Sequence, residues 1–434
     1  MLKILKKTYK QFAYRGILLE GMVVSVTEYL MLGGFVLVNF LINHYYGTEV
    51  VGVYALSFAI AQIGILGIGS VFSLLMRRDL SIGEYSANSY LAKVQILRSG
   101  NMAIVLVFAA AVILGFYSSL RVNLIFILLM ICIKGVDALN ETYYTAHQTL
   151  QDLREYGVFK CSNAIIFVGI SAFVCISRFD IVYLYLAQLV CAALMLAVNV
   201  FRWQKIRAKQ VEEKGLRCVD FRFLLIESYP LIVSAMVFQL GLRANNVLIF
   251  DVLGEKDLGI FSLIVITVGV FAGVANTLAI VFFGRLSRVF VEEPRAFSRR
   301  LHQTIGLFLG LGIMLMAACL VITPLSEFAF GLAFDRTLYT VMAAAIPFMF
   351  MVSCLGTMFT VIRKQKVGMY LTVVVMVFNL LAYFYLPQRY GLIGAGYAFL
   401  ITAIIQSMLI YLGTIVSLRL IDRDGRFDQS PSRQ

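Results

Sequence analysis

The sequence predicts an all-α membrane protein with twelve transmembrane helices, arranged as two parallel six-helix bundles with both termini in the cytoplasm. Three observations lead to this fold: the composition, a one-sided distribution of basic residues, and a repeat between the two halves of the chain. Hydrophobic residues make up 61% of the 434 residues and charged residues only 14%. Ordinary globular chains contain roughly half and a quarter, so this chain has too few charges to cover a water-exposed surface.

Apolar runs of about 20 residues, long enough to cross a bilayer, recur along the chain and are separated by short connectors. The longest connector, residues 202–222, is basic and is interpreted as a linker between a first bundle at 1–201 and a second bundle at 223–418. A cytoplasmic tail at 419–434 follows. The expected helices are 16–42, 51–76, 98–117, 121–146, 157–177, 181–201, 223–250, 258–284, 303–323, 337–361, 367–386 and 392–418.

The basic residues assign a direction to these helices. With the N-terminus inside, 30 of the 37 Lys and Arg residues fall in cytoplasmic segments and two, Lys134 and Arg243, fall inside the membrane. The opposite side receives five, which are Arg121, Arg178, Lys256, Arg336 and Arg389. This bias predicts the N-in, C-in orientation. It also accounts for the net charge of +13 without a nucleic-acid partner.

The two halves match each other at a constant offset of 207 residues. Because each half has an even number of helices, both halves enter the membrane from the same side. They are therefore expected to be parallel repeats about an axis along the membrane normal, with a cavity between them, as in transporters. The landmarks paired by this offset include Asn39 with Asn246, Gly47 with Gly254, Gly52 with Gly259 and Tyr54 with Phe261.

Polar groups inside the bilayer are costly and mark candidate sites. In the seventh expected helix, Gln239, Arg243 and Asn246 share one face. Arg243 has no acid one turn away, and the offset pairs it with Val36, so it belongs to one half only. Its guanidinium has the fork geometry that suits phosphate oxygens. We therefore take these three residues as candidate substrate-binding groups.

The first and fourth expected helices carry further charges. Lys134 is a candidate substrate-binding residue, with an intrahelical pair to Asp137 at i+3 as the alternative. Glu28 and Asp137 are candidates for coupling to a proton or sodium gradient, although Glu28 also suits a hydrogen-bonded carboxyl packed against a neighbouring helix. Asn39 is a further cavity candidate, and its alternative role is an interhelical hydrogen bond.

Tyr143 and Tyr144 lie on the same helix as Lys134 and are candidates to stack on sugar rings, although packing or interfacial placement is the commoner role of such tyrosines. The histidines, His44, His147 and His302, are expected in separate loops, which predicts no metal site. No Walker A motif is present, so intrinsic ATP hydrolysis is not expected, and no cofactor is predicted.

The glycine landmarks carry a resemblance to a known family. Residues 47–56 (GTEVVGVYAL) and 254–263 (GEKDLGIFSL) resemble the G-x-x-x-x-G-x-[YF] element of polysaccharide exporters, and residues 390–396 (YGLIGAG) resemble the G-x-x-G-A pattern of the same family. The chain as a whole is similar to the Wzx-type O-antigen or polysaccharide repeat-unit flippases of the MOP superfamily. On physical grounds alone, the glycines predict tight turns and close helix packing.

This resemblance implies a non-enzymatic flippase in the bacterial inner membrane. Its implied substrate is an undecaprenyl-pyrophosphate-linked oligosaccharide, moved from the cytoplasmic to the periplasmic leaflet for O-antigen or surface polysaccharide assembly. The implied partners are the polymerase and the chain-length regulator of that pathway. Two alternatives stay open: a cation-coupled, MATE-like multidrug antiporter, and a membrane-embedded glycosyltransferase or O-antigen polymerase.

Overall fold

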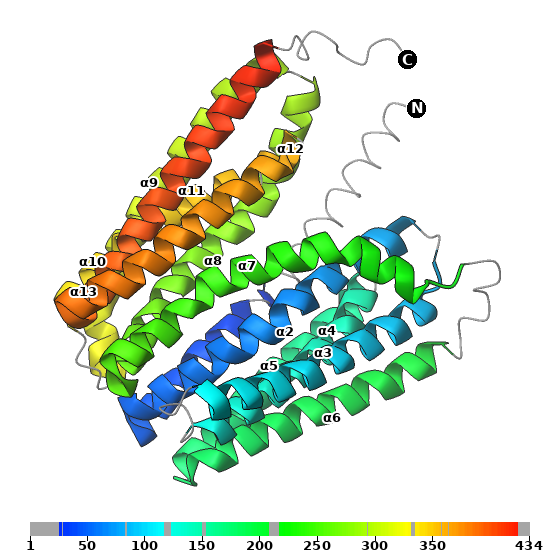
Figure 1. Cartoon of the computed structure of the whole chain (residues 1–434), viewed down its shortest axis with the longest axis vertical. Coiled ribbons are helices and arrows are strands. Elements are labelled where there is room, and N and C mark those ends of the chain that lie inside the picture. Colours follow the sequence, from blue (N-terminus) through cyan, green and yellow to red (C-terminus); the bar gives the residue numbers. More distant parts are fainter. Residues whose placement is uncertain are drawn as a thin grey trace, which may run out of the picture. The chain divides into compact units, whose positions relative to one another are not determined.

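The computed structural model describes residues 26–27, 29–82, 85–116, 123–149, 153–207, 217–292, 294–330, 335–356, 358–362 and 364–423. Nearly all of these residues are helical (Figure 1). They form two compact units, one containing the described residues up to Tyr45 together with Ile60–Met236, the other containing Tyr46–Ala59 and the described residues from Val237 onward. The predicted domain boundaries, 1–201, 202–222, 223–418 and 419–434, stay a prediction.

The first unit begins with the helical residues 26–27 and 29–45. Most of α2 (Thr48–Ile82) belongs to it, with α3 to α6 and the first part of α7. The bounds of these helices are α3 Ala87–Phe116, α4 Leu124–Thr149, α5 Leu153–Ile176, α6 Ile181–Arg207 and α7 Phe221–Leu253.

The second unit contains the start of α2, the end of α7 and the helices that follow. In α13 the chain reverses at Gly391, where φ is 61° and ψ is −144°, so α13 consists of two helices. These two helices lie side by side, with Leu371 packed at Gly413 (Figure 1). The remaining bounds are α8 Glu255–Glu292, α9 Pro294–Phe330, α10 Arg336–Ala343, α11 Ile346–Gly356, α12 Met358–Val361 and α13 Gln365–Arg423.

Within the described residues, nine helical segments are long and apolar enough to cross a membrane. One of them, 366–420, contains both helices of α13. α4 is not among the nine and carries Lys134, Asp137 and Glu141 along its apolar part. Many large apolar side chains lie exposed on the long helices, as a lipid environment requires, among them Val107, Phe108, Phe173, Leu194 and Val321. The protein is a multi-pass membrane protein; the count of twelve helices, the six-plus-six arrangement and the orientation stay predictions.

Several helices begin earlier than the apolar runs indicate. α3 starts at Ala87 rather than at 98, and the Ser86 hydroxyl accepts a hydrogen bond from the Ser89 amide at its first turn. α9 starts at Pro294 rather than at 303. The prediction located helices by hydrophobicity, and it missed these polar first turns for that reason. One consequence is that Arg98, expected as the first residue of the third helix and counted with the cytoplasmic residues, lies well inside α3.

The glycine element has a structural role in both of its copies. Gly47 and Gly254 have φ values of 92° and 87°, so each forms the turn between two helices in a conformation that glycine tolerates best. A Cβ at Gly52 would overlap the Glu255 carbonyl, and a Cβ at Gly259 would overlap the Thr48 carbonyl. The starts of α2 and α8 therefore cross with their backbones in contact. The positions in this crossing are related by the 207-residue offset, which pairs Gly47 with Gly254, Thr48 with Glu255 and Gly52 with Gly259. The repeat is therefore visible in the crossing.

The Gly52→Ala and Gly259→Ala variants should each destabilise the protein by about 2 kcal/mol, because the new methyl group meets backbone that cannot move independently of its helix. The thermal melting temperature in detergent measures this loss. Gly269→Ala on α8 is the matched control, since no atom lies within 4 Å of its new Cβ and alanine favours the helix. Equal melting temperatures for all three variants would contradict the close crossing.

In the first unit, the chain that precedes α7 packs against the start of α3. The Ser86 amide donates to the Arg217 carbonyl (3.0 Å), and the Val219 amide donates to the Ser89 hydroxyl (3.2 Å). Val219 is fully buried in an apolar cluster with Phe72, Met76, Tyr90, Trp203 and Leu224. The end of the predicted linker is thus attached to the first unit.

Candidate functional site

Arg243 lies on α7 in the second unit, inside a segment that is apolar enough to span the membrane. Its guanidinium carbon stands 5.6 Å from the ring centroid of Phe58, on the first part of α2. Its Nε is buried without a hydrogen-bond partner among the described residues. Arg243 is therefore a cation held against an aromatic face with hydrogen-bonding capacity unused.

Gln239 lies one turn before Arg243 on the same helical face. Its Oε1 is likewise buried without a donor among the described residues. Asn246, half-buried, shares this face. The structure therefore brings together the three α7 residues that the sequence singled out, and leaves an unused donor and an unused acceptor one turn apart.

The opposite face of α7 is attached to α13. Asn379 donates to the Gly241 carbonyl and to the Asn245 side-chain oxygen (3.0 Å), and it accepts from the Thr402 hydroxyl (3.1 Å). Positions 241 and 245 lie about half a turn around the helix from Arg243. These bonds fix the rotation of α7 and thereby the direction in which Arg243 and Gln239 project. Asn379 was not predicted, although a polar residue inside an apolar run was the signal that could have revealed it.

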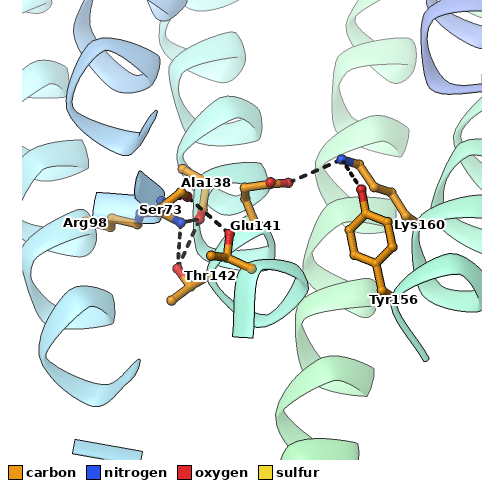
Figure 2. Close-up of polar contacts among 8 residues, drawn as sticks. Ser73, Arg98, Ala138, Glu141, Thr142, Tyr156 and Lys160 are labelled. Atoms are coloured by element: carbon orange, nitrogen blue, oxygen red, sulfur yellow. Dashed lines mark hydrogen bonds and ion pairs between the residues drawn. The ribbon is translucent and has the colours of Figure 1, made fainter. Parts of the chain in front are cut away.

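In the first unit, Lys134 donates to the Asp137 carboxylate at 2.9 Å. This is the intrahelical pair that the sequence offered as the alternative to substrate binding, and both side chains are partly exposed. Asp137, the ion-coupling candidate, thus has a lysine as counter-ion. Glu141, one turn further along α4, faces the buried Lys160 of α5 at 3.8 Å, and Lys160 also lies 3.3 Å from the Tyr156 hydroxyl (Figure 2).

Arg98 has the most hydrogen-bonded side chain of this region, and it was not among the predicted site residues. It is 4% exposed and donates to the carbonyls of Gly69 and Ala138 and to the hydroxyls of Ser73 (2.8 Å) and Thr142 (2.6 Å). One guanidinium therefore ties α3 to α2 and to α4 (Figure 2). Its neighbours Gln95 and Asn101 donate to the Leu139 and Gly64 carbonyls. The spacing of i, i+3 and i+6 was the signal that could have revealed this polar stripe.

The remaining candidates are two tyrosines, an asparagine and a glutamate. Tyr143 and Tyr144 are buried, Tyr143 beside Trp203 and Tyr144 in a cluster with Tyr156, Phe159 and Met195, so both pack in the core of the first unit. Asn39 is buried and donates to the Phe35 carbonyl of its own helix (2.8 Å). Glu28 lies outside the described residues.

The prediction that the three histidines lie in loops was wrong. His44 is helical, His147 lies in the last turn of α4, and His302 lies inside α9. His147 packs against Trp203 (5.4 Å between centroids), and His302 contacts the Tyr411 hydroxyl (3.2 Å). Each histidine therefore has its own packing environment.

The long apolar helices, the glycine crossing and the charged groups inside the spans together define a helical membrane protein, and solved structures share its fold. The lipid II flippase MurJ in its inward closed conformation matches with a TM-score of 0.65 and 15% identity, over 93% of this chain and 89% of that chain. A point mutant of the Vibrio cholerae MATE transporter VcmN matches with a TM-score of 0.64 and 13% identity, over 93% and 98%. An inward-facing multidrug resistance MATE family transporter of the MOP superfamily matches with a TM-score of 0.65 and 12% identity, over 93% and 96%.

Among curated proteins, the chain is similar to the capsular polysaccharide biosynthesis protein CapF of Staphylococcus aureus. The two are 23% identical over 341 residues, which covers 76% of this chain and 82% of CapF. No protein-family model matches the chain. The comparisons therefore establish the fold, and the resemblance to the polysaccharide exporters stays a prediction.

Proposed function

We propose that the protein is a flippase that moves an undecaprenyl-pyrophosphate-linked oligosaccharide from the cytoplasmic to the periplasmic leaflet of a bacterial inner membrane. The observation that carries the proposal is Arg243, a cation within a membrane span whose hydrogen-bonding capacity is not used by the described residues. Two likenesses support it: a fold shared with a lipid II flippase, and sequence similarity to a capsular polysaccharide biosynthesis protein.

The chemistry of the substrate explains why such a cation is needed. A pyrophosphate group that enters the membrane loses hydration, and a guanidinium in a medium of low dielectric constant offsets part of that cost. Arginine is suited to this role because it cannot be deprotonated and offers parallel N–H groups to phosphate oxygens. The face of α7 that carries Arg243 also presents Gln239 and Asn246, which are suited to sugar hydroxyls.

The fold alone does not separate this function from multidrug transport, because the MATE and MurJ likenesses are equal in strength. The charges favour a lipid-linked anion. An antiporter for cationic drugs needs free carboxylates, whereas Asp137 and Glu141 each face a lysine, Lys134 and Lys160. Within the described membrane spans, Arg243 has no anionic partner, and it lacks the hydrogen bonds to neighbouring helices that hold the buried Arg98. We therefore place coupling to protons or sodium second to recognition of the anionic headgroup.

The experiment is deletion of the protein in its native host. The lipid-linked oligosaccharide should accumulate in the cytoplasmic leaflet, because synthesis continues while transfer stops. A membrane-impermeant glycosidase applied to inside-out and right-side-out vesicles reports the leaflet, and re-expression of the wild-type protein is the control. Accumulation in the periplasmic leaflet would point to a defect in polymerisation, and undiminished surface polysaccharide would refute the proposal.

The proposed N-in, C-in topology predicts that Cys218 reacts from the cytoplasmic side only. Cys218 is exposed, whereas the other six cysteines, namely Cys132, Cys161, Cys175, Cys191, Cys319 and Cys354, are buried or partly buried. A membrane-impermeant maleimide should therefore label inside-out vesicles and leave intact cells unlabelled. The Cys218→Ser variant identifies the labelled site. Labelling of intact cells at Cys218 would reverse the topology.

A further inference from the structure

Phe58, Gln239 and Arg243 lie together in the second unit, and the first of them comes from a different helix. Phe58 is on α2, about 1.7 turns after Gly52, where the backbones of α2 and α8 are in contact. Arg243 and Gln239 are on α7, whose opposite face is bonded to Asn379 of α13. Interhelical contacts therefore hold both α2 and α7, so the positions of Phe58, Gln239 and Arg243 relative to one another are fixed.

Arg243 and Gln239 have complementary hydrogen-bonding groups without partners, a donor on Arg243 and an acceptor on Gln239. Arg243 has a buried Nε that needs an acceptor, and Gln239 has a buried Oε1 that needs a donor. They are one helical turn apart, which separates their Cβ atoms by about 6 Å. Buried polar groups are almost always satisfied, so a ligand that completes this pair presents an anionic oxygen and a hydroxyl about one turn apart. A sugar linked directly to a phosphate has both.

The Phe58 ring affects which N–H groups of Arg243 are available for hydrogen bonds. A guanidinium that lies against an aromatic face is attracted to it through its plane, and the N–H groups at its edge stay available for hydrogen bonds. The ring thereby holds the guanidinium by a contact that leaves its Nε without a hydrogen-bond partner among the described residues. Phe58 is thus a positioning residue, which acts on the substrate through Arg243.

We infer that Phe58, Arg243 and Gln239 form a subsite for the glycosyl-phosphate junction of the substrate, with Arg243 on the phosphate and the Gln239 carbonyl oxygen on a hydroxyl of the first sugar. This inference rests on the proposed function, and it adds that the protein distinguishes a glycosylated lipid phosphate from the bare lipid phosphate. The distinction prevents futile transport of the empty carrier lipid.

The test measures binding of two probes to the purified full-length protein in detergent by native mass spectrometry. One probe is a polyprenyl phosphate, and the other is the same polyprenyl phosphate carrying one hexose. Arg243→Ala should weaken both probes at least about tenfold. Gln239→Leu should weaken the hexose probe by about threefold to tenfold and leave the bare phosphate unchanged. Leu240→Ala, an exposed neighbour on α7, is the control and should alter neither.

Phe58 is tested with a pair of variants in the same assay. Phe58→Leu should weaken both probes by about threefold to tenfold, because the guanidinium loses its aromatic support. Phe58→Trp should restore binding to within about twofold, which a role in packing alone does not explain, since tryptophan is larger. The melting temperature of each variant shows whether it is folded.

The outcomes separate the inference from the proposed function. If Gln239→Leu weakens both probes equally or neither, Gln239 does not contact a sugar hydroxyl and the glycosyl-phosphate subsite is wrong. If Phe58→Leu binds as the wild type does, Phe58 does not position Arg243. If the wild-type protein binds neither probe more tightly than the uncharged polyprenol, the proposed function itself fails.

Discussion

The Arg98→Ala variant should lose about 4 kcal/mol of stability, the largest structural effect that we expect from one substitution in this protein. The change removes bonds from one guanidinium to Gly69, Ser73, Ala138 and Thr142, and it leaves a cavity where α2, α3 and α4 meet. Arg98→Lys should be intermediate, because an ammonium group cannot reach acceptors on both neighbouring helices at once. The melting temperature in detergent should fall by about 5 °C or more for the alanine variant.

The matched control is Arg202→Ala. Arg202 donates to the Glu155 carboxylate at 2.7 Å, but both side chains are substantially exposed. Exposed ion pairs contribute about 0–1 kcal/mol, so this variant should melt close to the wild type although it loses the same charge. A similar loss in both variants would mean that the loss of charge, and not the buried bonds of Arg98, determines the stability.

The helical character of the chain could be predicted because the bilayer imposes it. A membrane span satisfies its backbone within its own helix, so each long apolar run predicts one span. The first residues of the helices were harder to predict. Ala87 and Pro294 open α3 and α9 in polar sequence, where hydrophobicity carries no signal and capping residues such as Ser86 do. The glycine turns were predictable, because the repeat places a glycine at the same position, 47 and 254, in each half. Both glycines adopt positive φ in the structure.

The site could be predicted only in part. Arg243 and Gln239 stand out because polar groups are rare in apolar runs, and the i+3 spacing of Lys134 and Asp137 already suggested their pairing. Phe58 could not be found in this way, since it is one of 34 phenylalanines and only its position opposite Arg243 distinguishes it. Arg98 was placed at the cytoplasmic end of its helix because the predicted helix began too late. The structure adds to the sequence prediction the contacts between helices that are distant in sequence.

Arg243→Ala should abolish most of the surface polysaccharide of the host, which is the largest functional effect that we expect. A charge-assisted bond to a phosphate contributes about 1.5–3 kcal/mol, so transport should slow by roughly tenfold to a hundredfold. Arg243→Lys keeps the charge and loses the fork, and should therefore retain partial function. Surface polysaccharide per cell, normalised to the amount of protein in the membrane, measures both variants.

Two further comparisons decide what a loss of function at Arg243 means. Arg202→Ala removes an exposed arginine of the first unit and should leave polysaccharide at the wild-type level, which excludes an effect of net charge. Because the guanidinium makes no hydrogen bond or ion pair with the described residues, Arg243→Ala should not lower the melting temperature, in contrast to Arg98→Ala. The opposite outcome is a folded Arg243→Ala protein, at normal abundance, that supports full surface polysaccharide. It would show that another group neutralises the pyrophosphate and that the binding site lies away from α7.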